Sequence, residues 1–573
     1  MIQRAISRSV VILMLAVGII FSAGFSSCDH APDERSALQT QTLKPEPPPT
    51  PVGAPQLVFS TYLGGSSSFA SGCNPLTFAQ NAASDTLGNT YVTGATTVKD
   101  LPGTTNAYQP TPAPNSTMSA FVAKYGPTGQ LLWCTYLGGD NQSMGIGVAA
   151  MPNGGVVVVG LTASDNFPTL NPYQAQNNAT TGNSNYFVTV FDANGNPTYS
   201  TYLGGSGGEG QSPPYADDQN NGNCVAVDAA GLIYVAGMTK SSGANGGKKF
   251  PVTPNAQQGT IGGGMDACLC IIDPSQTPPN SSLIYASFLG GGGDDQGHSV
   301  AVNPSGSLIT VAGYTTSINF PLVNAFDQAV GSTSSGFVTQ FQSSQPGSTT
   351  SQYTMLYSTY LGGSNRDDTY GMTMDPFGLI VATGRTRDDD FPMTAAGPTI
   401  YNMAIPPISN DMPYVVKINP SLIGTASLVY STYLGGQGGF CTSVGVDALG
   451  AVYVAGESTA SGALYVPPPN VMPGSTTAPA TFPYTENALI KALPIGFEHV
   501  IFMQIDPVGD SLSYSTYLGG SAGDRTYGLA LDPYGNVVLT GLTFSVDFPL
   551  ENQAQNYPNN GYQNAFVTKF SGF

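Results

Sequence analysis

Short runs of apolar and polar residues, separated by turn-forming residues, recur along most of the chain and are clearest near its C-terminal end. Tyr527–Asp532 and Val537–Thr540 are predicted to be two short strands joined by the tight turn 533–536, and Ala565–Phe570 a third strand. The segment Tyr-Ser-Thr-Tyr-Leu supplies a fourth apolar strand. The pattern therefore predicts a unit of four short strands joined by turns and loops.

This unit is repeated. Ser-Thr-Tyr-Leu-Gly-Gly, or a close variant, occurs seven times, with its aromatic residue at Tyr62, Tyr136, Tyr202, Phe288, Tyr360, Tyr433 and Tyr517. The intervals of 74, 66, 86, 72, 73 and 84 residues can each hold one small sheet with its loops. Third strands are predicted at seven matching places: 120–125, 186–191, 267–272, 336–341, 414–418, 499–505 and 565–570. The repeat predicts an all-β, seven-bladed β-propeller of four-stranded blades.

The two ends of the chain share one unit. Leu57–Leu63 carries the first copy of the motif but precedes any first strand, whereas Phe573 follows a third strand closely. Leu57–Leu63 is therefore predicted to supply the missing strand of the last blade, so that hydrogen bonds between the chain ends seal the ring.

Composition agrees with this architecture. The 573 residues include 71 Gly and 45 Pro, and 41% are hydrophobic while only 9% are charged. This is too apolar for disorder and too rich in turn-forming residues for a helical protein. Because one repeat cannot bury its sheet without neighbours, residues 57–573 are predicted to form a single domain.

The segment from Tyr514 to Pro549 carries a resemblance. Its Tyr-Ser-Thr-Tyr-Leu-Gly-Gly, Asp-Pro-Tyr-Gly-Asn and Asp-Phe-Pro motifs resemble the bacterial SBBP repeat family, named for a predicted seven-bladed β-propeller. The resemblance covers residues 57–573. It implies the propeller fold in an exported protein, and it implies no set of catalytic residues, because members of that family are mostly uncharacterised.

The N-terminal residues indicate export. Arg4 and Arg8 precede the apolar run Val10–Phe21, so residues 1–27 are predicted to be a signal peptide. Ser26-Ser27-Cys28 is similar to a lipobox, which predicts lipidation of Cys28 and attachment to the bacterial cell envelope; an ordinary secretory signal is the alternative. Residues 28–56 are polar and Pro-rich and are predicted to be an extended tether.

Charge narrows the set of partners. The formal net charge is −19, from 35 acidic and 16 basic residues. Nucleic acid is excluded as a partner, because it requires a basic footprint. We expect contact with a membrane only through the lipid anchor.

Candidate binding residues follow the Gly-Gly pair in three units: Asp294, Asp295, Arg366, Asp367, Asp368, Asp524 and Arg525. Alternating strand directions place both classes of long loop on one face of the ring, which is the expected ligand surface. Carboxylates beside guanidinium groups suit glycan hydroxyls, peptide termini or a hard cation. The alternative is that these side chains only solvate their loops. No cofactor or metal is predicted, although Ca²⁺ remains an alternative ligand.

Signatures of catalysis are sparse. His298 and His499 are predicted to lie in a loop and in a third strand, and His30 lies in the tether, so no cluster of histidines with metal-ligand spacing exists. Cys268 and Cys270 are expected to be small buried residues of one strand face, and Trp133 part of the core between blades. Two functions fit: a surface-anchored module that binds an extracellular glycan or protein partner, or a polysaccharide hydrolase or lyase that uses loop carboxylates.

Overall fold

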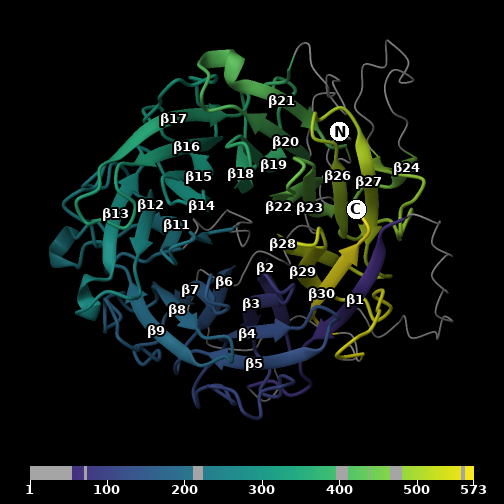
Figure 1. The fold of residues 1–573 in the computed structure, drawn as a ribbon, viewed down its shortest axis with the longest axis horizontal. Coiled ribbons are helices and arrows are strands. Elements are labelled where there is room, and N and C mark those ends of the chain that lie inside the picture. The colour runs from purple at the N-terminus through teal and green to yellow at the C-terminus, as the bar shows by residue number, and fades with distance from the viewer. Residues whose placement is uncertain are drawn as a thin grey trace, which may run out of the picture.

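The computed structural model describes residues 54–69, 74–210, 223–394, 411–435, 438–464, 481–556 and 562–573. They form seven four-stranded antiparallel sheets arranged around a central axis, as Figure 1 shows. The predicted all-β, seven-bladed propeller is confirmed.

The blades follow the chain, with the first strand of each innermost. The first three blades contain β2 (Thr77–Ser84), β3 (Thr90–Thr96), β4 (Ser119–Tyr125) and β5 (Leu131–Leu137); β6 (Ser143–Ala150), β7 (Val156–Thr162), β8 (Asn185–Phe191) and β9 (Pro197–Leu203); and β10 (Val225–Val227), β11 (Ile233–Thr239), β12 (Asp266–Ile272) and β13 (Leu283–Leu289). The next two contain β14 (Asp295–Val302), β15 (Leu308–Thr315), β16 (Ser335–Ser343) and β17 (Tyr353–Leu361); and β18 (Asp367–Met374), β19 (Ile380–Thr386), β20 (Met412–Ile418) and β21 (Leu428–Tyr433).

The sixth blade contains β22 (Gly439–Val446), β23 (Val452–Ser458), β26 (His499–Ile505) and β27 (Leu512–Leu518), with the short parallel pair β24 (Gly462–Leu464) and β25 (Phe482–Tyr484) beside it. The seventh contains β28 (Asp524–Leu531), β29 (Val537–Thr543), β30 (Asn564–Ser571) and β1 (Gln56–Leu63). Short 3-10 helices occupy Ala244–Gly246 (η2), Pro279–Ser281 (η3) and Gly424–Ser427 (η4). All seven predicted third strands are observed, most of them one or two residues longer than predicted.

The chain ends close the ring. β1 pairs antiparallel with β30, from Gln56 opposite Ser571 to Leu63 opposite Ala565. Figure 1 shows β1, at the purple end of the colour scale, beside the yellow β30. The predicted closure is confirmed, and the strand begins one residue earlier than expected.

The recurring Ser-Thr-Tyr motif binds each outer strand to the loop that crosses it. In β17, Ser358 Oγ donates to the carbonyl of Pro321 at 2.6 Å, and the Tyr360 hydroxyl donates to the carbonyl of Ser317 at 2.6 Å. The same pair of bonds occurs in the blades of β9 and β1. The motif and the Pro after each second strand are therefore parts of one structural clasp, because each satisfies buried polar groups of the other.

A β-bulge occupies the same place on six of the innermost strands. The bulged residues are Gln80, Ile146, His298, Tyr370, Thr442 and Tyr527. Opposite each bulge, the second strand carries glycine; at Gly313, for example, a Cβ atom would lie 1.8 Å from the carbonyl oxygen of Gln296. Glycine at this point of the second strand is therefore a packing requirement of the bulge.

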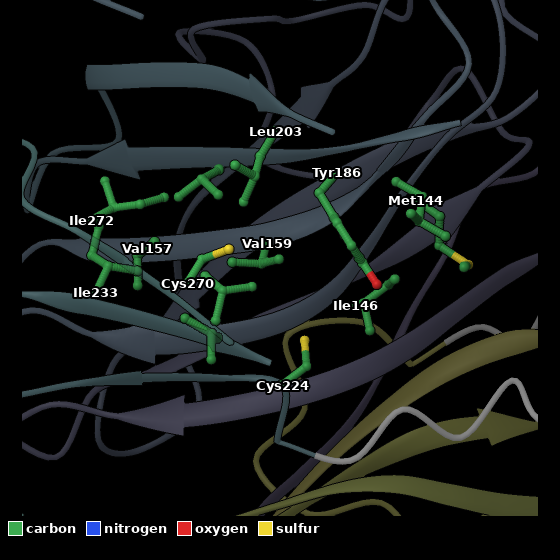
Figure 2. Close-up of a cluster of buried hydrophobic side chains, with 14 of the residues drawn as sticks. Met144, Ile146, Val157, Val159, Tyr186, Leu203, Cys224, Ile233, Cys270 and Ile272 are labelled. Carbon is green, nitrogen blue, oxygen red and sulfur yellow. The ribbon is translucent and has the colours of Figure 1, made fainter. Parts of the chain in front are cut away.

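The cores lie between blades. Figure 2 shows side chains of β6–β9 and β10–β13 packing together, with Cys224 and Cys270 among aliphatic neighbours. Cys134, Cys224, Cys268, Cys270 and Cys441 are all buried and free, which confirms the predicted burial of Cys268 and Cys270. Trp133 is partly buried, and its Nε1 donates to the carbonyl of Ala193 in the next blade at 3.2 Å.

The two faces of the ring differ. Because the strands of each blade are antiparallel, the connections from second to third strand and from fourth strand to the next blade lie on one face, as predicted. We name it the loop face, and the opposite side, which carries the first-to-second and third-to-fourth connections, the turn face. The loop face is where the candidate residues of the sequence lie.

Candidate functional site

Three of the predicted ligand residues are internal supports of the loops that carry them. Asp295, Asp367 and Asp524 are the first residues of β14, β18 and β28, and all are fully buried. Each carboxylate accepts a hydrogen bond from the amide of the second glycine of its own Gly-Gly pair, at 2.8 to 2.9 Å. Glu209 does the same for Gly205 at 3.0 Å. These carboxylates fix the loops that surround the axis, and they are engaged within the protein.

Burial changes the proton affinity of these acids. It raises the pKa of Asp295 to about 6 and the pKa of Glu209 to about 7. The pKa of Asp367 rises furthest, to about 9, because burial is joined by a hydrogen bond and charge repulsion from Asp388. Asp367 therefore keeps its proton at neutral pH, with the buried Asp388 carboxyl beside it.

The remaining candidates separate into two places. Asp294 is half-buried, and its Oδ1 lies 3.0 Å from the position of a Cβ on Gly264. Arg366, Asp368 and Arg525 lie at the loop-face ends of β18 and β28, where they take part in ion pairs. The structure thus brings together only part of the predicted set.

The group that does come together is larger than the sequence indicated, and we name it the arginine cluster. It comprises Arg366, Arg385, Arg387 and Arg525 with Asp368, Asp411, Glu457 and Glu498. Residues 54–573 contain only these four arginines, and all four lie on the loop face.

Arg385 is the buried centre of the cluster. It is 1% exposed, its Nε lies 2.7 Å from Oδ2 of Asp368, and its Nη1 lies 3.4 Å from Oδ2 of Asp411. Arg366 adds a second contact to Asp368 at 3.0 Å, and Arg387 pairs with Asp411. Burial alone would raise the pKa of Asp368, but the charges of Arg385 and Arg366 outweigh it and hold that pKa below its usual range.

The cluster extends into the next two blades through an aromatic ring. Phe440 of β22 lies 5.9 Å from the Arg385 guanidinium and opposite Glu457 in the strand register. Glu457 lies 3.7 Å from Nε of Arg525, which also donates to Glu498. The guanidinium of Arg385 further lies 5.6 Å from the ring of Tyr370, so that cation–π contacts assist the ion pairs.

His298 differs from its predicted position. It lies within β14, at the bulge, and not in a loop. It is fully buried, its Nδ1 is 2.9 Å from the carbonyl oxygen of Thr369, and its ring stacks on Tyr370 at 5.7 Å. The sequence places His298 soon after the Gly-Gly pair and two acidic residues, a polar stretch typical of a loop. In the structure β14 already begins at Asp295.

Part of the cluster is available for further bonding. Within the described residues, Nη2 of Arg385 and Oδ1 of Asp368 are buried and have no hydrogen-bond partner. The side chains of Arg387 and Glu498 are 41% and 36% exposed. A buried guanidinium with an unused donor, bordered by accessible charged groups, is a typical feature of a binding site for polar ligands.

Arg385, Arg387, Asp411, Glu457 and Glu498 were not predicted from the sequence. Arg385 lies near the end of β19 and Arg387 directly follows that strand. No sequence motif marks this point of the repeat. The available signal was the rarity of arginine after residue 53. The rarity of arginine by itself could not show that the four side chains lie on the same face of the ring.

Other kinds of site are not indicated. In the part of the chain that the structure describes, no group of three or more His, Cys, Asp or Glu is arranged to hold a metal ion. No helix among the described residues is long and apolar enough to cross a membrane. Cys28 and Cys73 lie outside the described residues, as do the predicted signal peptide and most of the tether.

Comparisons with known proteins add only distant likenesses of shape. No family model and no curated protein matches the chain. Among solved structures, Sqt1 from Chaetomium thermophilum has a TM-score of 0.36 at 11% identity and covers 90% of this chain and 98% of its own. A quinohemoprotein alcohol dehydrogenase from Comamonas testosteroni has a TM-score of 0.34 at 9% identity, covering 91% and 77%. A gluconolactonase from Xanthomonas campestris has a TM-score of 0.27 at 11% identity, covering 68% and 94%. These scores are too low to support any functional argument.

Proposed function

We propose that the protein is an exported binding module of the bacterial cell envelope whose ligand docks on the loop face, at the arginine cluster. The observation that carries the proposal is the convergence of all four arginines of residues 54–573 on one end of the ring. Arginine contributes little to stability as a scattered surface residue, whereas its planar fork suits polar recognition.

The chemistry of the cluster favours a ligand that offers both donors and acceptors. Four guanidinium groups and four carboxylates balance in formal charge. An extracellular glycan meets this requirement with its hydroxyl groups, and a polar loop of a protein partner is the second possibility. Phe440, partly exposed between the two halves of the cluster, offers a ring on which a sugar can stack.

The location of the protein is part of the same proposal. The predicted signal peptide, lipidation at Cys28 and Pro-rich tether, together with the resemblance to the SBBP repeat family, support attachment to the cell envelope. A rigid ring held on a tether suits a receptor or scaffold.

A polysaccharide hydrolase or lyase remains the alternative, but the carboxylates first assigned to it support it weakly. Glycosidases need two carboxyl groups facing one substrate. Asp295, Asp367 and Asp524 instead each bond within the loop of their own blade.

The test is a thermal-shift screen of the purified protein against neutral oligosaccharides, uronic-acid oligosaccharides, short peptides and Ca²⁺. We expect an oligosaccharide to raise the Tm, because a ligand at a hundred times its Kd stabilises the native state by about 2.7 kcal/mol. Arg387→Met and Arg525→Met should each abolish that shift.

The matched control is Lys248→Met, which removes an exposed positive charge from another loop of the same face. It should leave the shift unchanged. If both arginine variants keep the full shift, the ligand does not bind at the cluster. Stabilisation by Ca²⁺ alone would identify a cation site in place of a glycan site.

A further inference from the structure

The turn face carries exposed apolar side chains on four consecutive blades. We name Leu87, Phe377, Leu449, Val508 and Tyr534 the apolar crescent; their exposed fractions are 68%, 73%, 81%, 56% and 69%. Four of them occupy the third position of a first-to-second strand turn, in the blades of β18, β22, β28 and β2. The same position is Asn153, Ala230 or Ser305 in the other three blades.

Turns of the crescent contact each other across two of its blade boundaries. The ring of Phe377 lies 3.8 Å from the position of a Cβ on Gly450, in the next turn, and Pro507, adjacent to Val508, lies 3.5 Å from the same point. The ring of Tyr534 lies 3.2 Å from the corresponding point on Gly88, in the turn that carries Leu87. Each of these two aromatic side chains therefore lies over the turn of the following blade.

The fold does not require these side chains. The turn Asp accepts hydrogen bonds from its own turn, as Asp375 does from the amides of Phe377 and Leu379 at 2.9 Å. The turn Gly adopts a positive φ, 82° at Gly378. The third position has neither role, so large apolar residues there cost solvation without contributing to the turn.

The turn carboxylates beneath Leu87, Phe377 and Tyr534 are neutralised inside the protein. Lys124, Lys417 and Lys569 pair with the turn residues Asp85, Asp375 and Asp532 at 3.8, 3.0 and 2.7 Å. All six side chains are less than 10% exposed. Burying the tips against an apolar phase therefore leaves these charges paired.

The chain enters the ring on this same face. β1 begins at Gln56, opposite Ser571, and Pro55 lies 3.6 Å from the position of a Cβ on Gly572. Residues 1–53 precede that point, and they include Cys28 and most of the predicted tether. A membrane anchor in this segment would bring the turn face, and not the loop face, towards the bilayer.

We propose that the apolar crescent docks on the bilayer to which the N-terminal segment attaches the protein. A single lipid anchor holds a protein only marginally, and stable attachment needs a second contact. Leucine, valine and aromatic side chains without an accompanying basic patch suit a zwitterionic lipid surface. Docking leaves the arginine cluster facing away from the membrane. This inference rests on the envelope location proposed above and not on the ligand site. It departs from the expectation, drawn from the sequence, that the lipid anchor is the sole contact with the membrane.

The experiment uses the full chain in phosphatidylcholine vesicles and reads membrane contact from tryptophan fluorescence. The chain has a single tryptophan, Trp133, so the fluorescence of the unsubstituted protein gives the background signal. Tyr534→Trp and Leu449→Trp report on the crescent. Ile318→Trp is the matched control, because Ile318 is 86% exposed on the loop face.

We expect the added tryptophan at 534 or 449 to shift its emission to the blue and to be quenched by brominated phosphatidylcholine, and the added tryptophan at 318 to show neither effect. Replacing Phe377 and Leu449 together with serine in the Tyr534→Trp chain should remove the quenching. Both substituted side chains are exposed, so the ring should remain folded.

The opposite results overturn the proposal in distinguishable ways. Flotation of the vesicles in a density gradient measures attachment. A chain that floats with the vesicles, but whose added tryptophans at 534 and 318 are quenched equally, is attached without docking on its turn face. A chain that does not float with them refutes the envelope location itself. Self-association in sedimentation that the double serine substitution abolishes would assign the crescent to a second copy of the chain.

Discussion

At the scale of single residues, one position of each blade shows how the repeat varies without changing the ring. Asp295, Asp367 and Asp524 begin the innermost strands of three blades, and Glu209 forms an isolated bridge with Thr239 at the equivalent point of the blade of β10. Three of these acids accept a hydrogen bond from a serine after the second strand, at Ser241, Ser317 or Ser545. In the fifth blade Asp388 replaces the serine, and a shared proton replaces the hydroxyl.

This substitution predicts a pH dependence of stability. The pKa of Asp367 is raised to about 9 in the native state, so above its unfolded pKa near 4 the native state holds a proton that the unfolded state has lost. Stability due to this pair is therefore complete at acidic pH and declines as pH rises towards 9, by at most about 1.4 kcal/mol per pH unit.

Asp388→Ser should remove that decline, because a hydroxyl can donate to an ionised Asp367 as Ser317 does to Asp295. The measurement is the free energy of unfolding in urea at several values between pH 5 and pH 9. Asp389→Ser is the control, since Asp389 is exposed, and it should behave like the parent. Equal pH slopes in the parent and in Asp388→Ser would show that the pair holds no proton.

At the scale of strands, the bulge on the innermost strand decides which residues line the axis. It places Gln80, Ile146, His298, Tyr370, Thr442 and Tyr527 at equivalent points around the ring. It also brings a carbonyl of the first strand against a glycine of the second. The arginine cluster is built next to this distortion, since Asp368 and Arg525 supply two of those carbonyls.

Gly313→Ala tests the bulge. The new Cβ would lie 1.8 Å from the carbonyl oxygen of Gln296, a distance that no side-chain movement can relieve. We expect a loss of stability on the order of 3 kcal/mol or a failure to fold, measured by urea unfolding. Gly259→Ala is the control, because its Cβ meets nothing within 4 Å. A parent-like Gly313→Ala would mean that the strands pair differently.

At the scale of the whole molecule, the ring has no free sheet edge at its seam. The last blade takes three strands from one end of the chain and one from the other. Closure of this kind joins the ends by hydrogen bonds, such as that between Ser60 Oγ and Thr568 Oγ1 at 2.8 Å. Ala54 and the C-terminal residues therefore lie together on the turn face.

A circular permutant follows from this closure. Linking Phe573 to Ala54 and opening the chain at Val508 would give the blade of β22 the divided arrangement now held by the last blade. We expect its urea midpoint to lie close to that of the parent, because exposed turns tolerate new ends. A permutant opened at Val311, inside β15, should not fold. If neither permutant folds, the ring can be closed only at its present position, in the last blade.

The sequence determined the architecture because each feature of the repeat has a local cause. Strand alternation, turn Asp and Gly, and the Ser-Thr-Tyr clasp act within one blade or across one loop, so their spacing alone gave seven blades and a closing strand. Burial of the cysteines followed from their place in apolar strands.

Tertiary structure decided what the candidate residues do. Asp295 and Asp524 hold their own loops. Arg385 and Glu457 stand 72 positions apart in the sequence and belong to adjacent blades, and both lie beside Phe440. Contacts between blades depend on side chains that the repeat does not constrain. The periodicity of the sequence therefore does not predict them. Arrangement around the axis creates the arginine cluster and the apolar crescent, so both exist only once the ring has closed.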